Sequence, residues 1–284
     1  MAAVLWKIAG ETIDFSHRAM IMGVLNVTPD SFSDGGQFFE ADTAVEQGKR
    51  MAAEGAQIID IGGESTRPGA DEVPESEELA RVLPIIQRLR ADESTPLISI
   101  DTTKANVARA ALDAGANIIN DVTGGRADAA MMPLAAERGA GFIILHMQGT
   151  PRTMQVNPQY DDVVSEVAEF FRQQYARAVG CGIDPLTIAF DPGIGFGKTL
   201  QHNLELLRNL PRLRIENRPL VVGVSRKSFL GKVIDSRDVA DRIAPTIAMT
   251  ALLRERGADV IRVHDVKPNV AALRAADALR PAAL

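Results

Sequence analysis

The stretch Gly223-Val224-Ser225-Arg226-Lys227-Ser228-Phe229-Leu230-Gly231 decides the fold. It completes an apolar run, Leu220 to Val224, that ends abruptly in a cluster of serine, arginine and lysine. Such a run predicts a buried parallel strand that carries polar groups to the rim of its sheet. If a helix follows closely, Ser228 lies near its N-terminus beside two cations, and such a place favours an anion.

Seven other short apolar runs accompany this one, and longer amphipathic segments separate them. The eight predicted strands are 21–25, 58–61, 97–100, 118–119, 142–145, 187–190, 220–224 and 260–263. The predicted helices are about 42–54, 76–90, 104–114, 129–138, 159–179, 200–209, 239–257 and 267–279. Strands that alternate with helices predict parallel βαβ units. Eight such units predict an α/β fold, a (β/α)8 TIM barrel. The alternative is an open doubly wound sheet, which usually has fewer strands and a dinucleotide fingerprint.

Length and composition fit a single globular domain over residues 1–284. The chain is 46% hydrophobic and 24% charged, and its formal net charge of -6 argues against nucleic acid as a partner. Its one cysteine, Cys181, excludes an intrachain disulfide and fits a reducing compartment. Neither a signal peptide nor a run of about 18 apolar residues is present, so we expect a cytoplasmic protein with no membrane partner.

Residues 1–20 precede the first predicted barrel strand. Apolar segments at 4–8 and 12–15 flank Ala9-Gly10-Glu11, and this pattern predicts a small N-terminal hairpin. Two later connections, 26–40 and 62–74, are longer than packing needs and rich in Gly, Ser, Thr, Pro and acidic residues. Long loops after barrel strands usually carry function, although two mobile surface loops are the simpler alternative.

Polar residues stand at the ends of the predicted strands, on the face where barrel enzymes place their active sites. In chain order they are Asn26, Asp101, Asn120, His146, Asp191, Lys227 with Ser228, and Arg262 with His264; the loop after the second strand adds Thr66, Arg67 and Pro68.

Each of these residues also has a simpler interpretation. Asp101 could cap the next helix, and Asn120 or Asp191 could belong to a turn. His146 fits a hydrogen-bonded core histidine best. Four of these residues, however, together form a polar cluster over one mouth of the predicted barrel: Asp101, Asn120, Asp191 and Lys227. Because buried polar groups are costly when unpaired, we expect a ligand with many donors and acceptors.

The residue types narrow the chemistry of that ligand. Two carboxylates accept from ring NH and amino groups, Asn120 offers a donor and an acceptor, and Lys227 donates. This set suits a planar heterocycle with an aminopyrimidinone edge. Arg262 and His264 share a strand face, so that Arg262 could stack on the ring and also reach an anion. His264 and Asn26 could complete an anion and metal site at the rim.

Several familiar motifs fail in this chain. Residues 193–199 resemble a phosphate loop, but the Walker pattern requires glycine where Pro192 stands, and the dinucleotide fingerprint fails as well. No His/Cys cluster has zinc spacing, and residues 223–227 lack the last glycine of a nucleophile elbow. Lys227 could still form a Schiff base, as in barrel aldolases.

The motifs identify a family. The chain resembles the bacterial dihydropteroate synthases, of the pterin-binding barrel family. The matching stretches run in order along nearly the whole chain: MGVLNVTPDSFSDGG (22–36), GGESTRPG (62–69), SID (99–101), NIIND (117–121), HMQGTP (146–151), FDPGIGFGK (190–198), GVSRKSFLG (223–231) and IRVHDV (261–266). The resemblance implies that para-aminobenzoate attacks the methylene of 6-hydroxymethyl-7,8-dihydropterin diphosphate, releasing dihydropteroate and diphosphate on the route to folate.

The resemblance also implies roles for single residues. The residues that would hold the pterin are Asp101, Asn120, Asp191 and Lys227, with Leu145 in apolar contact and Arg262 stacked on the ring. Asn26 would bind Mg²⁺, and the diphosphate would lie near Thr66, Arg262 and His264. Para-aminobenzoate would contact Phe32, Arg67, Pro68, Phe196 and Ser228. The expected catalytic residues are Asp101, Lys227, Arg262 and His264.

Assembly and three alternative functions stay open on the sequence alone. The family suggests a homodimer, and Ile243, Ile247 and Leu253 in the helix at 239–257 could face a partner or pack on the barrel. The alternatives are a methyltetrahydrofolate-binding methyltransferase, a non-catalytic pterin-binding paralogue and a barrel aldolase that uses Lys227.

Overall fold

A computed structural model describes residues 3–28, 37–67 and 69–280. Eight parallel strands form one sheet in the order β8-β7-β6-β5-β4-β3-β10-β9. They are β3 (Met20–Asn26), β4 (Ile58–Gly62), β5 (Leu97–Asp101), β6 (Ile118–Asp121), β7 (Gly141–Leu145), β8 (Ile188–Asp191), β9 (Val221–Gly223) and β10 (Val260–Val263). An isolated parallel bridge between Phe190 and Leu220 joins the two ends, so that the sheet closes into a barrel. The predicted barrel is confirmed, and the strand ends move by a residue or two.

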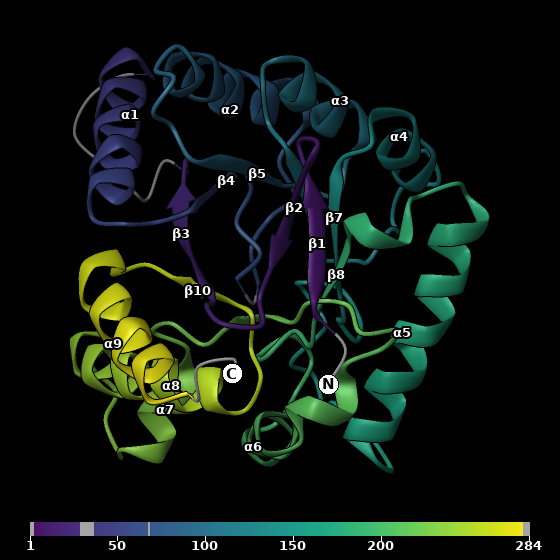
Figure 1. The fold of residues 1–284 in the computed structure, drawn as a ribbon, viewed down its shortest axis with the longest axis vertical. Coiled ribbons are helices and arrows are strands. Elements are labelled where there is room, and N and C mark those ends of the chain that lie inside the picture. The colour runs from purple at the N-terminus through teal and green to yellow at the C-terminus, as the bar shows by residue number, and fades with distance from the viewer. Residues whose placement is uncertain (1–2, 29–36, 68, 281–284) are drawn as a thin grey trace.

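Helices surround the barrel (Figure 1). They are α1 (Gln37–Ala53), α2 (Glu75–Arg90), α3 (Ala105–Asp113), α4 (Met131–Arg138), α5 (Val163–Gly180), α6 (Leu200–Arg208), α7 (Ser228–Val233), α8 (Ile243–Glu255) and α9 (Val266–Leu279), with 3-10 turns η2 (Pro185–Thr187), η3 (Leu210–Leu213) and η4 (Ala240–Arg242). In the described ranges, no helix combines the length and apolar character needed to cross a bilayer.

Helix boundaries follow local capping. The helix expected from residue 159 begins at Val163, because the Asp162 side chain accepts hydrogen bonds from the amides of Val164 and Ser165. The segment expected at 239–257 divides into a 3-10 turn and α8. The short helix α7 was not among the predicted helices, but it places Ser228 at a helix N-terminus, as the first stretch suggested.

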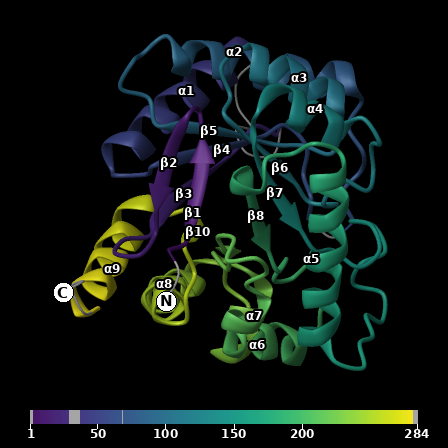
Figure 2. The ribbon, with the colours of Figure 1, turned by 45° about the vertical axis from the view of Figure 1, so that its right-hand side comes forward.

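An N-terminal hairpin covers one mouth of the barrel. Strands β1 (Leu5–Ile8) and β2 (Glu11–Asp14) pair antiparallel, and the turn residues Ala9 and Gly10 both have positive φ, as a tight hairpin turn requires. Figures 1 and 2 show the hairpin lying against the barrel strands. The Trp6 indole donates to the Thr187 carbonyl at 2.7 Å. The hairpin predicted within residues 1–20 is confirmed, and the structure adds that it closes this mouth as a fixed plug.

The plug completes an apolar floor inside the barrel. The floor consists of Trp6, Ile8 and Phe15 of the N-terminal segment and of inward residues from the strands: Met22, Ile58, Ile118, Ile143, Ala189, Val221 and Val260, with Leu97 packed beside them. Alternate residues of the same strands, such as Ile59, Ile119 and Ile261, belong to the outer core beneath the helices. Each strand is thus buried on both faces, as its continuous apolar sequence indicates.

Candidate functional site

The polar residues of the open mouth lie on the strand faces that form the floor. Side chains two apart on a strand share a face, so Asn120 stands above Ile118 and Asp191 above Ala189. The register places Asp101 beside Asn120 on neighbouring strands and Leu145 beside Asp191. Strand geometry therefore gathers residues that are far apart in sequence.

Arg262 crosses the barrel interior to two carboxylates. Its guanidinium donates to Asp60 and to Asp101, at 2.6 and 2.8 Å. Asp60 is fully buried, and it also accepts from the Asn120 amide at 3.2 Å. Asp60 thus fixes the positions of Arg262 and Asn120 from below.

Asp101 is an unusual carboxyl group. Burial and the nearby charge of Asp60 raise its pKa to about 7, although Arg262 opposes this effect. Beside it, the buried Asn120 side-chain oxygen has no hydrogen-bond partner within the described part of the chain. Together these groups offer acceptors that a bound molecule with N–H donors would satisfy.

Lys227 lies opposite this group, at the start of α7. Its ammonium donates to the Ile194 carbonyl and lies 4.5 Å from the centre of the Phe196 ring. Burial lowers the pKa of Lys227 to about 8, and the charge of Asp191 counteracts part of that effect. Burial also disfavours the charged form of Asp191 and therefore raises its pKa. One oxygen of Asp191 accepts a hydrogen bond from the Gly193 amide at 2.7 Å.

Another lysine, Lys198, is buried and supports the loop behind Lys227. Its ammonium lies 3.0 Å from Nδ1 of His146 and donates to the carbonyls of His146, Gly193 and Phe196 at 2.9–3.2 Å. Burial, followed by the charge of Lys227, lowers the pKa of Lys198 well below the usual range. Lys198 therefore fixes the loop that carries Phe196. His146 is buried and hydrogen-bonded, as expected of a core histidine.

The glycines of this loop serve packing. A Cβ atom at Gly193 would lie 1.9 Å from the His146 carbonyl oxygen, and one at Gly197 would lie 2.6 Å from that of Gln148. Both residues have positive φ. The likeness of residues 193–199 to a phosphate loop thus has a structural cause that needs no phosphate.

His264 stands at the rim above Arg262. Its backbone amide donates to the Ser225 hydroxyl at 3.1 Å, and its Nδ1 lies 3.0 Å from the same oxygen. Burial lowers the pKa of His264 to about 4, and the nearby positive charges of Arg262, Arg226 and Arg67 contribute. The imidazole is therefore neutral at pH 7 in a region of positive potential, which suits an anionic ligand.

The remaining predicted residues lie around this rim. Asn26 ends β3 beside Gly62, Thr66 and Arg67 lie in the β4–α2 loop (residues 63–74), and Ser228 is exposed. Phe32 and Pro68 fall outside the described residues. No group of three or more His, Cys, Asp or Glu side chains in the described ranges is arranged to hold a metal.

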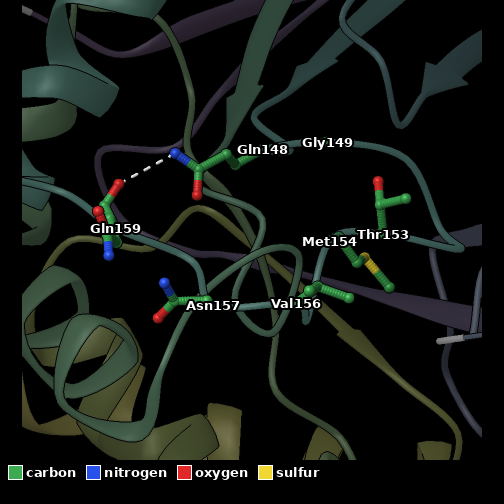
Figure 3. A pocket seen from close by; sticks show the side chains of 7 residues that line it. All are labelled: Gln148, Gly149, Thr153, Met154, Val156, Asn157 and Gln159. Atoms are coloured by element: carbon green, nitrogen blue, oxygen red, sulfur yellow. Dashed lines mark hydrogen bonds between the residues drawn. The ribbon is translucent and has the colours of Figure 1, made fainter.

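An apolar patch adjoins the polar mouth. It consists of Val122, Leu145, Met147 and Met154, with Phe196 packed against them. Met154 also lines a surface pocket of about 520 Å³, together with other residues of the β7–α5 connection (Figure 3). The Gln148 amide donates to the Gln159 carbonyl at 3.0 Å across it. The lining of the pocket includes none of the polar residues described above for the mouth.

The structure decides between the interpretations that the sequence left open. The residue that precedes α3 is Lys104, whose side chain does not cap the helix, and the first helical amide, that of Ala105, donates to Asp128, so Asp101 is not the cap. Asp191 starts a turn, in which it accepts from the Gly193 amide, and it also faces the mouth. Leu253 is fully buried and packs on the barrel, while Ile243 and Ile247 are partly buried.

Sequence reasoning missed Asp60, Lys198 and Ser225 as supports of the site. Asp60 carried a signal, because it is the one charged residue in the run Ile58–Ile61 and shares a strand face with the floor residue Ile58. Lys198 belongs to the failed phosphate-loop pattern and ends the matching stretch 190–198, and neither indicates a supporting role.

Comparisons with known proteins agree with this geometry. A family model described as pterin binding enzyme matches residues 22–264. A dihydropteroate synthase of Synechocystis sp. is 48% identical over 271 residues, which cover 95% of this chain and 93% of that protein. The structure of Xanthomonas albilineans dihydropteroate synthase with 4-aminobenzoic acid aligns with a TM-score of 0.90 and 42% identity over 98% of both chains. Burkholderia cenocepacia dihydropteroate synthase complexed with 7,8-dihydropteroate aligns with a TM-score of 0.87 and 39% identity, again over 98% of both chains.

Proposed function

The chain belongs to the pterin-binding enzyme family, and we propose that it joins 6-hydroxymethyl-7,8-dihydropterin diphosphate to para-aminobenzoate at the open mouth of the barrel. This is the transferase activity of a dihydropteroate synthase in folate biosynthesis. The observation that carries the assignment to this mouth is the buried Asn120 oxygen, which lacks a partner among the described residues and lies beside the carboxylate of Asp101.

The pterin edge would bind across the mouth. Asp101 and Asp191 accept from its ring N–H and amino groups, Asn120 contributes a donor and an acceptor, and Lys227 donates to its carbonyl or ring nitrogen. Arg262 stacks on the ring plane while Asp60 holds its guanidinium. Burial excludes competing water, so each hydrogen bond gains strength.

The diphosphate would lie at the rim, within reach of Thr66, Arg262 and neutral His264. The donor set suits Mg²⁺, because the Asn26 side chain supplies one hard oxygen and Mg²⁺ commonly takes its other ligands from phosphates and water. Asn26 would hold the ion, whose chemistry would be to take up charge that develops on the leaving diphosphate. Arg262 supplies positive charge to the same leaving group.

Para-aminobenzoate would enter beside Lys227 and Phe196. Its carboxylate is met by Arg67 and Ser228, Phe196 forms the apolar wall, and Leu145 lines the pterin side. Phe32 and Pro68 belong to this proposed subsite on the grounds of the sequence resemblance.

The displacement breaks the bond between the methylene carbon and the diphosphate oxygen and forms the bond to the amine nitrogen. We propose a loose displacement, because the pterin ring stabilises positive charge on the methylene and the rim cations stabilise the leaving anion. The neutral aromatic amine attacks without a strong general base and then loses a proton to solvent. The two long loops would close over the site and limit the access of bulk water while the bonds change.

We also propose that the chain forms a homodimer through α7 and α8. Val233, Ile234, Val239 and Leu252 in this region are exposed apolar side chains. Light scattering of the wild type and of Leu252→Glu checks this proposal, which predicts a dimer that the charge weakens.

Turnover tests the assignment of the site. Purified wild type is mixed with the pterin diphosphate, para-aminobenzoate and Mg²⁺, beside Asp101→Ala and Lys227→Ala. We expect dihydropteroate from the wild type and a loss of at least a hundredfold in kcat/KM from either variant. Lys49→Ala, which removes an exposed lysine of α1, is the matched control and keeps full activity. Normal activity in both site variants would contradict the proposed pocket.

A further inference from the structure

Lys104 joins neighbouring βα units beside the mouth. It precedes α3, and its ammonium donates to Glu64 in the β4–α2 loop and to Glu78 of α2, the latter at 2.6 Å. The Glu78 side chain is fully buried, whereas those of Lys104 and Glu64 are 25% and 22% exposed. A buried carboxylate needs a charged partner, so Glu78 fixes the Lys104 ammonium beneath the loop.

Helix α2 holds the beginning of the same loop at two further points. The Arg81 guanidinium donates to the Gly63 carbonyl at 2.6 Å. A Cβ atom at Gly63 would lie 2.9 Å from Val82 and 3.0 Å from Cγ of Glu78, so the backbone passes directly over the helix. Residues 63–64 are therefore fixed by packing, by a backbone hydrogen bond and by an ion pair.

Later contacts of the loop are weaker. The Gly69 amide donates to the Pro151 carbonyl at 3.2 Å, and Asp71 pairs with Arg152 at 2.5 Å. The side chains of that ion pair are 89% and 63% exposed, and exposed pairs contribute little. The Lys104 contacts are thus the stronger anchor, and Thr66 and Arg67 follow directly after them.

We propose that Lys104, with Glu64 and Glu78, is a positioning residue that fixes the start of the β4–α2 loop and thereby places Thr66 and Arg67 over the mouth. The proposal rests on the proposed function, because it assigns these loop residues to the diphosphate and to para-aminobenzoate. Asp101 and Asn120 lie on strands and are positioned by Asp60 and Arg262, although the charge of Glu78 contributes to the raised pKa of Asp101. The clamp therefore acts on the substrates held by the loop and not on the pterin ring.

The variant Glu64→Gln isolates the loop side of the clamp, since it leaves the buried Lys104–Glu78 pair intact. We expect the KM for para-aminobenzoate to rise and kcat to fall, with a combined loss of about tenfold or more in kcat/KM. The affinity for 6-hydroxymethylpterin, which has no diphosphate, should stay at the wild-type value. Hydrogen exchange at the amides of residues 63–67 should become faster.

Further variants separate positioning from folding. Lys104→Met leaves Glu78 buried without its cation and risks unfolding, so Lys104→Met/Glu78→Gln, which removes both charges, is the working variant. It should fold and match Glu64→Gln in kinetics. Lys104→Arg, which keeps the charge, should restore part of the activity. Arg109→Met, which breaks an exposed pair between Arg109 of α3 and Glu137 of α4, is the matched control and should behave as the wild type.

The outcomes distinguish this proposal from the proposed function. Wild-type kinetics and exchange in both Glu64→Gln and the double variant would overturn the clamp. Loss of 6-hydroxymethylpterin affinity in parallel with activity would also overturn it, because the contacts would then serve the fold as a whole. A wild type that makes no dihydropteroate, together with faster exchange at residues 63–67 in Glu64→Gln, would reject the function and retain the clamp.

Discussion

Replacing Asp101 with asparagine should stabilise the protein at pH 8 while it impairs pterin binding. In the folded chain the pKa of Asp101 is raised from 3.8 to about 7, mainly by burial and then by the charge of Asp60. Between these two values the folded state keeps a proton that the unfolded state has lost. The free energy of unfolding therefore falls as the pH rises through this window.

The pKa values set the magnitude of the effect. The difference between the folded and unfolded pKa values corresponds to about 4 kcal/mol of the free energy of unfolding, and this contribution is fully lost above pH 7. Asparagine resembles the protonated acid and avoids most of this loss, which already includes the opposing attraction of Arg262. We expect a net gain of about 2–4 kcal/mol at pH 8, or about 4–12 °C in Tm. At pH 5, Asp101 is protonated in the folded chain and only about 1–2 kcal/mol of this contribution has been lost, so the gain should be smaller than at pH 8.

The assay is urea unfolding of wild type and Asp101→Asn at pH 5, 6, 7 and 8, without ligand. Asp92→Asn is the control, because hydrogen bonds from Ser94 lower the pKa of this exposed carboxyl, so that the variant should show no gain as the pH rises. If Asp101→Asn were less stable than wild type at pH 8, or if the difference did not change with pH, the burial argument would be refuted. Loss of pterin affinity in the stabilised variant would show that the site is costly to the fold.

Three other predictions follow from the same contacts. The pH profile of kcat/KM for the pterin diphosphate should be a narrow bell, because Asp101 must lose its proton near pH 7 and Lys227 must keep its proton below about pH 8. Initial rates from pH 5.5 to 9.5 measure this profile, and a flat profile would disprove the assignment. Lys198→Met should raise the KM for para-aminobenzoate, because the loop that carries Phe196 loses its support, and should lower the free energy of unfolding by about 2–4 kcal/mol. Steady-state kinetics and urea unfolding measure the two effects, and an unchanged KM would contradict the supporting role. Trp6→Ala should lower the free energy of unfolding in urea by about 3–5 kcal/mol and leave kcat and KM unchanged, because the hairpin fills the mouth of the barrel opposite the proposed site. A change in KM would contradict the separation of the hairpin from the site.

The fold was predictable because each barrel strand is a short apolar run that ends in polar residues. Buried parallel strands require this pattern, and the hairpin carried its own turn signal at Ala9 and Gly10. Helix starts were less predictable, since they depend on single caps such as Asp162. Helix α7 is too short for its periodicity to be recognised in sequence.

Partnerships within the site were only partly predictable. The strand-end rule found Asp101, Asn120 and Arg262, because it needs only the position of each residue along its strand. It could not find the pair between Asp60 and Arg262, which are distant in sequence and meet only when the barrel closes. The same holds for Lys198, whose acceptors come from two separate βα connections.

The most direct test of the central claim is product formation by the purified chain. The pterin diphosphate and para-aminobenzoate are supplied with Mg²⁺, and dihydropteroate is identified by mass spectrometry while diphosphate is counted. The account predicts equal amounts of the two products, and none when either substrate is omitted. Saturable pterin binding without dihydropteroate would contradict it and would favour a methyltransferase or a non-catalytic pterin-binding protein. Trapping of a substrate on Lys227 by borohydride would indicate an aldolase instead.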